Sequence, residues 1–149
     1  MKRITEYKKL FGVEKEIELK ALKTSYRNLV KEWHPDKFQE GDEMREKAET
    51  HSRKIIDGYH FLVSIAPETR AAHFEEYSAT INNSEISDYH HEGMILEIFY
   101  SDGNTYEFFG VSKQIYRKMV NSNKVNRFAK RSIYPRFIYR KANRSVVEA

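Results

Sequence analysis

The sequence predicts an α-helical first half followed by a small α+β second half, and three observations support this division. Apolar residues recur at helical spacing as far as about residue 77, whereas β-type runs occupy residues 94–109. A polar stretch at 78–87 lies between the two patterns. Charge is divided as well: residues 111–149 hold 11 Lys/Arg and one acid, which leaves 15 Lys/Arg and 21 Asp/Glu for residues 1–110. Halves of opposite net charge indicate two units with different partners.

Composition limits the class of protein. A chain of 149 residues, 40% hydrophobic and 32% charged, is typical of one globular domain or two small ones. No apolar run approaches the roughly 20 residues of a membrane span, and the polar residues after Met1 do not resemble a signal peptide. The chain has no cysteine, which excludes disulfides and thiolate metal sites. We therefore expect a cytoplasmic protein without a membrane partner.

The first two helices are expected at residues 5–11 and 16–32, with Gly12 ending the first. The apolar side of the first carries Tyr7, Leu10 and Phe11. Apolar residues at helical spacing form one stripe on the second: Leu19, Leu22, Tyr26, Leu29, Val30 and Trp33. Basic residues form another stripe about 130° away: Lys20, Lys23, Arg27 and Lys31. One face of the second helix should therefore pack in a core, and the other should be a positively charged ridge.

An exposed turn follows the second helix at His34-Pro35-Asp36, because proline disfavours helical geometry in the residue before it. A third helix is expected over 42–65 and should run antiparallel to the second, since the turn is short. Its apolar side carries Met44, Ala48, Ile55, Tyr59 and Leu62. A last short helix is expected over 68–77, after Pro67. Its inward residues are Ala71, Phe74 and Tyr77.

These residues resemble the J domain of the DnaJ co-chaperones, over about residues 5–77. The resemblance is carried by the runs Tyr7-Lys8-Lys9-Leu10-Phe11-Gly12-Val13, Leu22 to Lys37 with its His-Pro-Asp, Ile56-Asp57-Gly58-Tyr59 and Thr69-Arg70-Ala71-Ala72. It implies a helical hairpin with two short flanking helices that docks on a DnaK-type ATPase chaperone and accelerates its ATP hydrolysis. The implied contact residues are Lys23, Tyr26, Arg27, His34, Pro35, Asp36 and Lys37.

Physical reasoning agrees with that implication. A basic ridge attracts an acidic partner surface at long range, and Asp36 can accept hydrogen bonds from a partner arginine. Two residues depart from the family pattern, since Asn28 replaces a common basic residue and Trp33 a common tyrosine. The Gly/Phe-rich linker and the cysteine-rich zinc module of full-length DnaJ are absent from this sequence.

Structural alternatives exist for each of these features. His34-Pro35-Asp36 could simply end a helix, with Asp36 capping local amides. A basic stripe alone is usually a solvated helix face. Adjacent His90 and His91 would point to opposite faces of a strand and lack carboxylates at metal-ligand spacing, so we expect no metal site and no cofactor.

The second half is expected to hold a three-stranded antiparallel sheet crossed by one helix. The first strand lies around Ile86 and Tyr89, and two further strands at 94–100 and 105–109 are joined by a hairpin turn at 101–104. The turn contains Asp-Gly, and a lone acid does not make a calcium site. Ser112 should cap a helix that runs to about residue 121. Its expected inward residues are Ile115, Tyr116, Met119 and Val120, and its expected outward residues are Lys113, Arg117 and Lys118.

This half is similar to the small KTSC domain, over residues 84 to about 139. The similarity is carried by Tyr89, the turn Phe99-Tyr100-Ser101-Asp102-Gly103, the run Tyr106-Glu107-Phe108, Gly110-Val111 and Ile133-Tyr134-Pro135-Arg136. The predicted organisation is then a J domain at 1–77, a linker at 78–87 and a KTSC-like basic α+β domain at 88–149. RNA binding has been suggested for the KTSC family.

Residues near the C-terminus fit nucleic acid as a partner. Basic residues that could neutralise phosphates are Lys124, Arg127, Lys130, Arg131, Arg136, Arg140, Lys141 and Arg144. Rings that could stack on bases are Phe128, Tyr134, Phe137 and Tyr139. The alternatives are that the rings belong to the core while the basic residues are merely solvated, or that the surface docks an acidic client protein.

The functional hypothesis is a J-domain co-chaperone whose basic half recruits a client or nucleic acid. The alternative is an RNA- or DNA-binding protein in which the J module is accessory or degenerate. No enzymatic activity is expected, because the sequence shows no activated nucleophile, no paired inward carboxylates and no Gly-rich phosphate loop.

Overall fold

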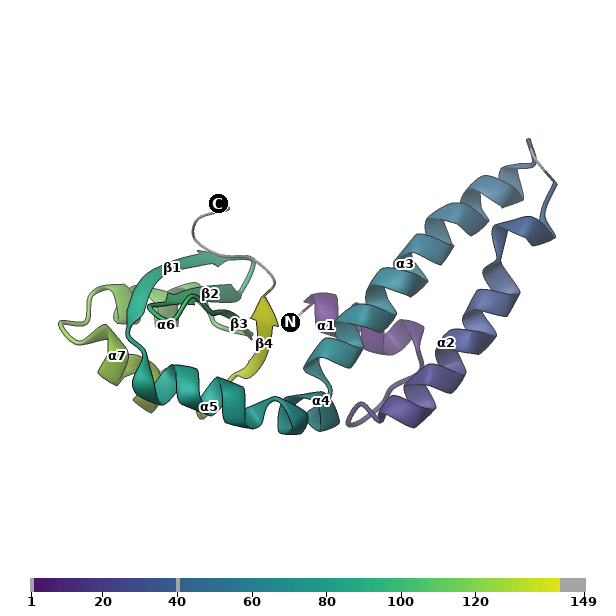
Figure 1. Cartoon of the computed structure of the whole chain (residues 1–149). Coiled ribbons are helices and arrows are strands. Elements are labelled where there is room, and N and C mark those ends of the chain that lie inside the picture. Colours follow the sequence, from purple (N-terminus) through teal and green to yellow (C-terminus); the bar gives the residue numbers. More distant parts are fainter. Residues whose placement is uncertain (1, 40, 143–149) are drawn as a thin grey trace. The chain divides into compact units, whose positions relative to one another are not determined.

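The computed structural model describes residues 2–39 and 41–142, and Figure 1 shows their arrangement within each unit. The helical elements are α1 (Lys2–Leu10), α2 (Leu19–Trp33), the 3-10 turn η1 (Pro35–Lys37), α3 (Glu43–Ile65), α4 (Pro67–Ala72), α5 (Phe74–Asn83), α6 (Lys113–Val120), α7 (Val125–Phe128) and the π-helical turn η2 (Ala129–Ile133). The strands are β1 (Ile86–Glu92), β2 (Ile95–Tyr100), β3 (Thr105–Phe109) and β4 (Ile138–Ala142). Contacts divide the chain into two compact units, Lys2–Thr69 and a second that begins at Arg70. The predicted order of an α unit followed by an α+β unit is confirmed.

Helix α1 ends at the predicted place for the predicted reason. Gly12 has a φ of 70°, which L-residues with side chains rarely adopt. That conformation lets the Val13 N–H donate to the Lys8 carbonyl at 2.8 Å and the Gly12 N–H donate to the Lys9 carbonyl at 3.3 Å. The chain is then free to turn into α2.

Helices α2 and α3 form the predicted antiparallel hairpin (Figure 1). The buried side chains of this unit include Phe11, Ile17, Leu22, Ala48, Ile55, Phe61, Leu62, Ile65 and Ala66. Helix α1 packs closely on α3, because a Cβ added to Gly58 would lie 2.8 Å from Tyr7 Cδ1. The Asp42 carboxylate caps α3 by accepting the Met44 N–H at 3.0 Å. The inward position predicted for Met44 is wrong: its side chain is 40% exposed in this first turn.

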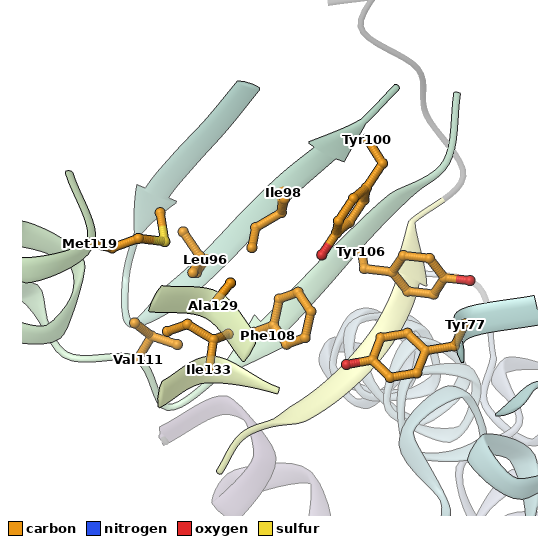
Figure 2. Close-up of a cluster of buried hydrophobic side chains, with 10 residues drawn as sticks. All are labelled: Tyr77, Leu96, Ile98, Tyr100, Tyr106, Phe108, Val111, Met119, Ala129 and Ile133. Atoms are coloured by element: carbon orange, nitrogen blue, oxygen red, sulfur yellow. The ribbon is translucent and has the colours of Figure 1, made fainter. Parts of the chain in front are cut away.

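The second unit is built on a four-stranded antiparallel sheet in which each strand pairs with the next along the chain. Strand register brings Leu96 opposite Phe108 and Ile98 opposite Tyr106, so one face of the sheet is continuously apolar. Helical residues cover this face, as Figure 2 shows. The buried cluster consists of Tyr77, Leu96, Ile98, Tyr100, Tyr106, Phe108, Val111, Met119, Ala129 and Ile133.

Two features of this unit differ from the prediction of three strands and one helix. Strand β4 adds a fourth strand, with Tyr139 opposite Phe108 and Arg140 opposite Glu107. Helix α7 and the turn η2 add a second helical segment after α6. Both were missed because their apolar residues alternate with closely spaced Lys and Arg, which favoured an interpretation of this stretch as a binding surface. In α6, Val120 is 42% exposed, so its predicted inward position is wrong.

The predicted linker and last helix also need correction. The segment 68–77 is not one helix but parts of α4 and α5, separated at His73. Helix α5 continues through 78–83, most of the predicted linker, because Tyr77 and Thr80 are buried one turn apart despite the polar composition around them. Ala71 and Phe74 are exposed rather than inward, and Phe74 is 55% exposed. The division between the units therefore lies at Thr69/Arg70.

None of the helices in the described ranges is both long enough and apolar enough to cross a membrane.

Candidate functional site

The turn between α2 and α3 has a defined backbone. His34 is extended, with φ −62° and ψ 128°, as expected for a residue before proline, and this conformation ends α2. Pro35 opens the helical turn η1, a position where its missing N–H has no consequence. The Lys37 N–H donates to the His34 carbonyl and the Phe38 N–H to the Pro35 carbonyl, both at 3.0 Å. The predicted turn is therefore present and hydrogen-bonded.

The side chains of His34 and Asp36 interact in a way that leaves the carboxylate accessible. The Asp36 N–H donates to His34 Nδ1 at 3.2 Å, so the His34 ring caps the turn η1. Asp36 Oδ2 lies 3.6 Å from the same nitrogen, and the side chains of His34 and Asp36 are 50% and 81% exposed. Among the described residues, no donor binds the Asp36 carboxylate. The alternative in which Asp36 caps local amides is therefore not supported, because the capping group is the His34 ring.

Residues of α3 hold both ends of the turn in place. The Ser52 hydroxyl donates to the Trp33 carbonyl at 2.8 Å, and Arg45 Nη1 donates to the Phe38 carbonyl at 3.3 Å. The Trp33 ring packs against the ring of His51, with the centroids 4.4 Å apart. No local pattern in the sequence indicates these supporting residues, since their role depends on the register between α2 and α3.

The expected chaperone-contact residues lie on α2 and this turn. Lys23, Arg27 and Lys37 are exposed, and so are the other members of the basic stripe, Lys20 and Lys31. Pro35 is half-buried. Tyr26 is also half-buried, because its ring stacks on that of Tyr59 in α3 at a centroid distance of 4.1 Å. A hollow of about 340 Å³ on α2 is lined by Thr24, Tyr26, Arg27, Asn28, Val30 and Lys31.

Seven of the eight basic residues that could contact nucleic acid lie in the described part of the chain, and they separate into two groups. Lys124, Arg127, Lys130, Arg131 and Arg136 are exposed. Arg140 instead donates twice to Glu107 Oε1, at 2.6 and 3.1 Å, and Lys141 pairs with Glu76 of α5. Strand β4 therefore uses both of its cations in ion pairs within the unit. Arg144 lies outside the described residues.

The interleaved rings belong to the core, as the structural alternative proposed. Phe128, Tyr134, Phe137 and Tyr139 all pack against the buried cluster. The Tyr134 and Tyr100 hydroxyl oxygens are 2.9 Å apart and hydrogen-bonded. The ring of Tyr139 stacks on the ring of Tyr77, with their centroids 3.6 Å apart. Burial raises the pKa of Tyr134 to about 12, so its hydroxyl stays neutral at physiological pH. These rings are therefore partly buried, and none of them is fully exposed as a surface on which bases could stack.

The hairpin turn at 101–104 is tied to helix α5. The Thr80 hydroxyl donates to Asp102 Oδ2 at 2.7 Å, and the Asn104 N–H donates to Oδ1 at 2.9 Å. Asn104 Nδ2 donates to the Thr80 hydroxyl oxygen at 3.0 Å. Burial raises the pKa of the Asp102 carboxyl, but the bonds from Thr80 and Asn104 outweigh it and hold that pKa below its ordinary value. This carboxylate therefore joins the hairpin turn to helix α5.

The adjacent histidines lie on opposite faces of β1, as predicted. His91 Nε2 is 2.7 Å from the Val111 carbonyl, and its ring stacks on Tyr116 of α6. His90 lies opposite Glu97 in the neighbouring strand and 3.8 Å from Glu92. Within the described ranges, no three His, Asp or Glu side chains are grouped to hold a metal ion.

The two units thus form a helical hairpin with an exposed His-Pro-Asp turn and an α+β domain with a basic helical layer. Comparison with known proteins gives a relative for each. Residues 82–137 match the KTSC domain family. Helix α5 up to Ile81 and strand β4 lie outside that match, although both contribute to the core of the unit.

The N-terminal half is similar to chaperones of the DnaJ type. It is 33% identical over 73 residues to the chaperone protein DnaJ of Mesomycoplasma hyopneumoniae (strain 232), which is 48% of this chain and 19% of that protein. It is 35% identical over 66 residues to DnaJ of Thermotoga maritima, 44% of this chain and 16% of that protein. The curved DNA-binding protein of Shigella dysenteriae serotype 1 is 28% identical over 89 residues, 59% of this chain and 26% of that protein. The chain spans 16–26% of the length of these curated relatives.

Proposed function

We propose that the protein is a non-enzymatic co-chaperone: its N-terminal unit docks on a DnaK-type ATPase chaperone and stimulates ATP hydrolysis, while its second unit recruits a client or nucleic acid. The observation that carries this proposal is the Asp36 carboxylate, which is 81% exposed beside His34. An exposed carboxylate that no described donor binds has its hydrogen-bonding capacity left for a partner. Similarity to DnaJ over this half supports the same partner class.

The electrostatics of α2 suit such a partner. Its four stripe cations project away from the core, and among the described residues none has an ion-pair partner. Exposed charge of one sign accelerates encounter with an acidic surface, and this acceleration weakens as salt screens it. The turn then provides the specific contact, because its backbone is fixed by η1 and by Ser52 and Arg45.

Single-turnover ATP hydrolysis by a DnaK-type chaperone from the same cell tests the proposal. We expect the chain to accelerate hydrolysis and His34→Gln to abolish the acceleration. His90→Gln is a matched control, because the His90 side chain is 49% exposed and that of His34 50%. Equal loss in both variants, or no stimulation by the unaltered chain, would contradict the docking role.

The second candidate is a nucleic-acid-binding protein with an accessory N-terminal unit, and the exposed cations of the second unit favour it. The name of the Shigella relative identifies curved DNA as a ligand of that protein. This alternative predicts nucleic-acid binding that His34→Gln leaves unchanged, together with no stimulation of ATP hydrolysis. Stimulation of ATP hydrolysis by the unaltered chain therefore separates the candidates.

A further inference from the structure

The helical layer of the second unit presents an unusual concentration of unpaired positive charge. Eight exposed cations lie on α6, at the N-cap of α7, on α7 and η2, and in the turn that follows: Lys113, Arg117, Lys118, Lys124, Arg127, Lys130, Arg131 and Arg136. We call them the basic helical surface. Residues 111–142 contain no Asp or Glu, and among the described residues none of the eight has an ion-pair partner.

These cations point away from the core for a structural reason. Met119 of α6 and Ala129 and Ile133 of η2 contact the same apolar sheet face, as Figure 2 shows, so the opposite sides of these helices face solvent. The cations of each helix lie on that opposite side by helical spacing. An ordinary solvated surface mixes both signs of charge, whereas residues 111–142 contribute only positive charge to this one.

The same packing decides which polyanion the surface suits. Binding of single-stranded nucleic acid without sequence preference depends on rings on which bases stack. Phe128, Tyr134 and Phe137 are partly buried against the core, and none of the aromatic rings in residues 111–142 is fully exposed for stacking. Double-stranded nucleic acid requires no stacking, and its backbone carries one charge per about 1.7 Å of helix axis. Exposed Gln114, Asn121 and Asn123 could add neutral hydrogen bonds to phosphate oxygens.

We propose that the basic helical surface binds the phosphate backbone of double-stranded nucleic acid, without base stacking or sequence readout. This inference specifies the recruiting role proposed above for the second unit, and it does not depend on chaperone docking.

The test is fluorescence anisotropy of a labelled mixed-sequence DNA duplex of about 20 base pairs, with one of its strands measured in parallel, titrated with the full chain. We expect the duplex to bind more tightly than the strand. The logarithm of its binding constant should fall linearly with the logarithm of salt concentration, with a slope of about −0.9 per phosphate contacted. Tighter binding of the single strand, or no binding of the duplex, would overturn the proposal.

A charge-matched pair of triple variants locates the site. Lys124→Ala/Arg127→Ala/Lys130→Ala removes three cations from the basic helical surface, and we expect it to weaken duplex binding by about tenfold or more and to flatten the salt slope by about 3. Lys47→Ala/Arg53→Ala/Lys54→Ala removes the same charge from exposed positions of α3 and should bind as the unaltered chain does. Equal losses in both variants would show attraction by net charge alone and overturn the assigned site.

Two additional measurements complete the test. Circular dichroism of both triple variants checks that each is folded. Sedimentation with phosphatidylserine-containing vesicles tests the competing anionic partner, and binding to vesicles without binding to the duplex would contradict the proposal. Stimulation of ATP hydrolysis is measured separately, so failure of duplex binding and failure of the co-chaperone role remain distinguishable.

Discussion

Two turns of this molecule carry an exposed aspartate, and they use it in opposite ways. Asp102 accepts hydrogen bonds from Thr80 and Asn104, so its carboxylate joins the β2–β3 hairpin to α5. Asp36 is 81% exposed, and within the described residues its carboxylate accepts no hydrogen bond. In the second case the neighbouring histidine satisfies the local backbone, which leaves the carboxylate for a partner. The comparison shows that the hydrogen bonds of an aspartate, rather than its exposure, separate a structural turn from a candidate docking turn.

The largest expected effect concerns Asp36. Asp36→Asn should reduce stimulation of a DnaK-type ATPase by about tenfold or more, because the charged acceptor for the partner is lost. The free energy of unfolding should change by less than about 0.5 kcal/mol, as for other exposed substitutions. Single-turnover hydrolysis and urea unfolding measure the two quantities. A large loss of stability would mean that Asp36 belongs to the fold after all.

The reverse result is expected for Asp102. Asp102→Ala should lower the free energy of unfolding of the second unit by about 1–2 kcal/mol, because the buried Thr80 hydroxyl loses its acceptor. The Asp102 carboxylate is exposed to solvent, so we expect the loss of unfolding free energy to be near the lower end of the values typical of hydrogen bonds to charged groups. Urea unfolding followed by tyrosine fluorescence reports it, and Asp36→Ala is the matched control. Similar losses in the two variants would remove the distinction between the turns.

The pH dependence of stability sharpens the same comparison. Hydrogen bonds hold the pKa of Asp102 below its ordinary value of 3.8 in the folded state, so the stabilisation from its charged form is fully present above that value. It should be lost as pH falls through the lower folded pKa. The difference in unfolding free energy between the unaltered chain and Asp102→Ala should therefore be constant near neutral pH and shrink below about pH 4. Unfolding titrations at a series of pH values measure this, and a difference that grows on acidification would contradict the assignment.

The smallest expected change in the free energy of unfolding concerns the β1–β2 turn, where a residue other than glycine has a positive φ. Gly93 and Met94 join β1 to β2 with φ values of 57° and 64°, which glycine adopts freely and methionine does not. Met94→Gly should raise the free energy of unfolding by about 0.5–1 kcal/mol. Met94→Ala keeps the strain and removes only a 43% exposed side chain, so it should have little effect. Thermal unfolding of both variants compares them, and stabilisation by alanine would indicate another cause.

Sequence patterns predicted most of the fold because two local signals were strong. Helical spacing located α2 and α3, and Pro35 located the turn between them. Strand β4 was missed because Arg140 and Lys141 obscure its alternation, and their partners Glu107 and Glu76 are distant in the sequence. Helix α5 was missed because two buried side chains, Tyr77 and Thr80, outweigh a composition typical of linkers.

The candidate sites were predictable to different degrees. Exposure of the basic stripe followed from helical spacing alone, and the exposed turn followed from Pro35. Which cations of the second unit stay unpaired did not follow, since pairing depends on strand register. The sequence also did not predict whether the rings face the core or solvent. Phe128 and Tyr134 pack inward because the sheet provides an apolar face on that side.

Helix α5 shows that the boundary of a sequence family need not be the boundary of a folding unit. The KTSC match begins at residue 82, yet Tyr77 stacks on Tyr139 and Thr80 binds the β2–β3 turn. A fragment cut at residue 82 would lose those contacts and uncover tyrosines that α5 now shields. Domain exchange should therefore transfer residues 70–142 together, so that the α+β unit keeps its own first helix when attached to another helical hairpin.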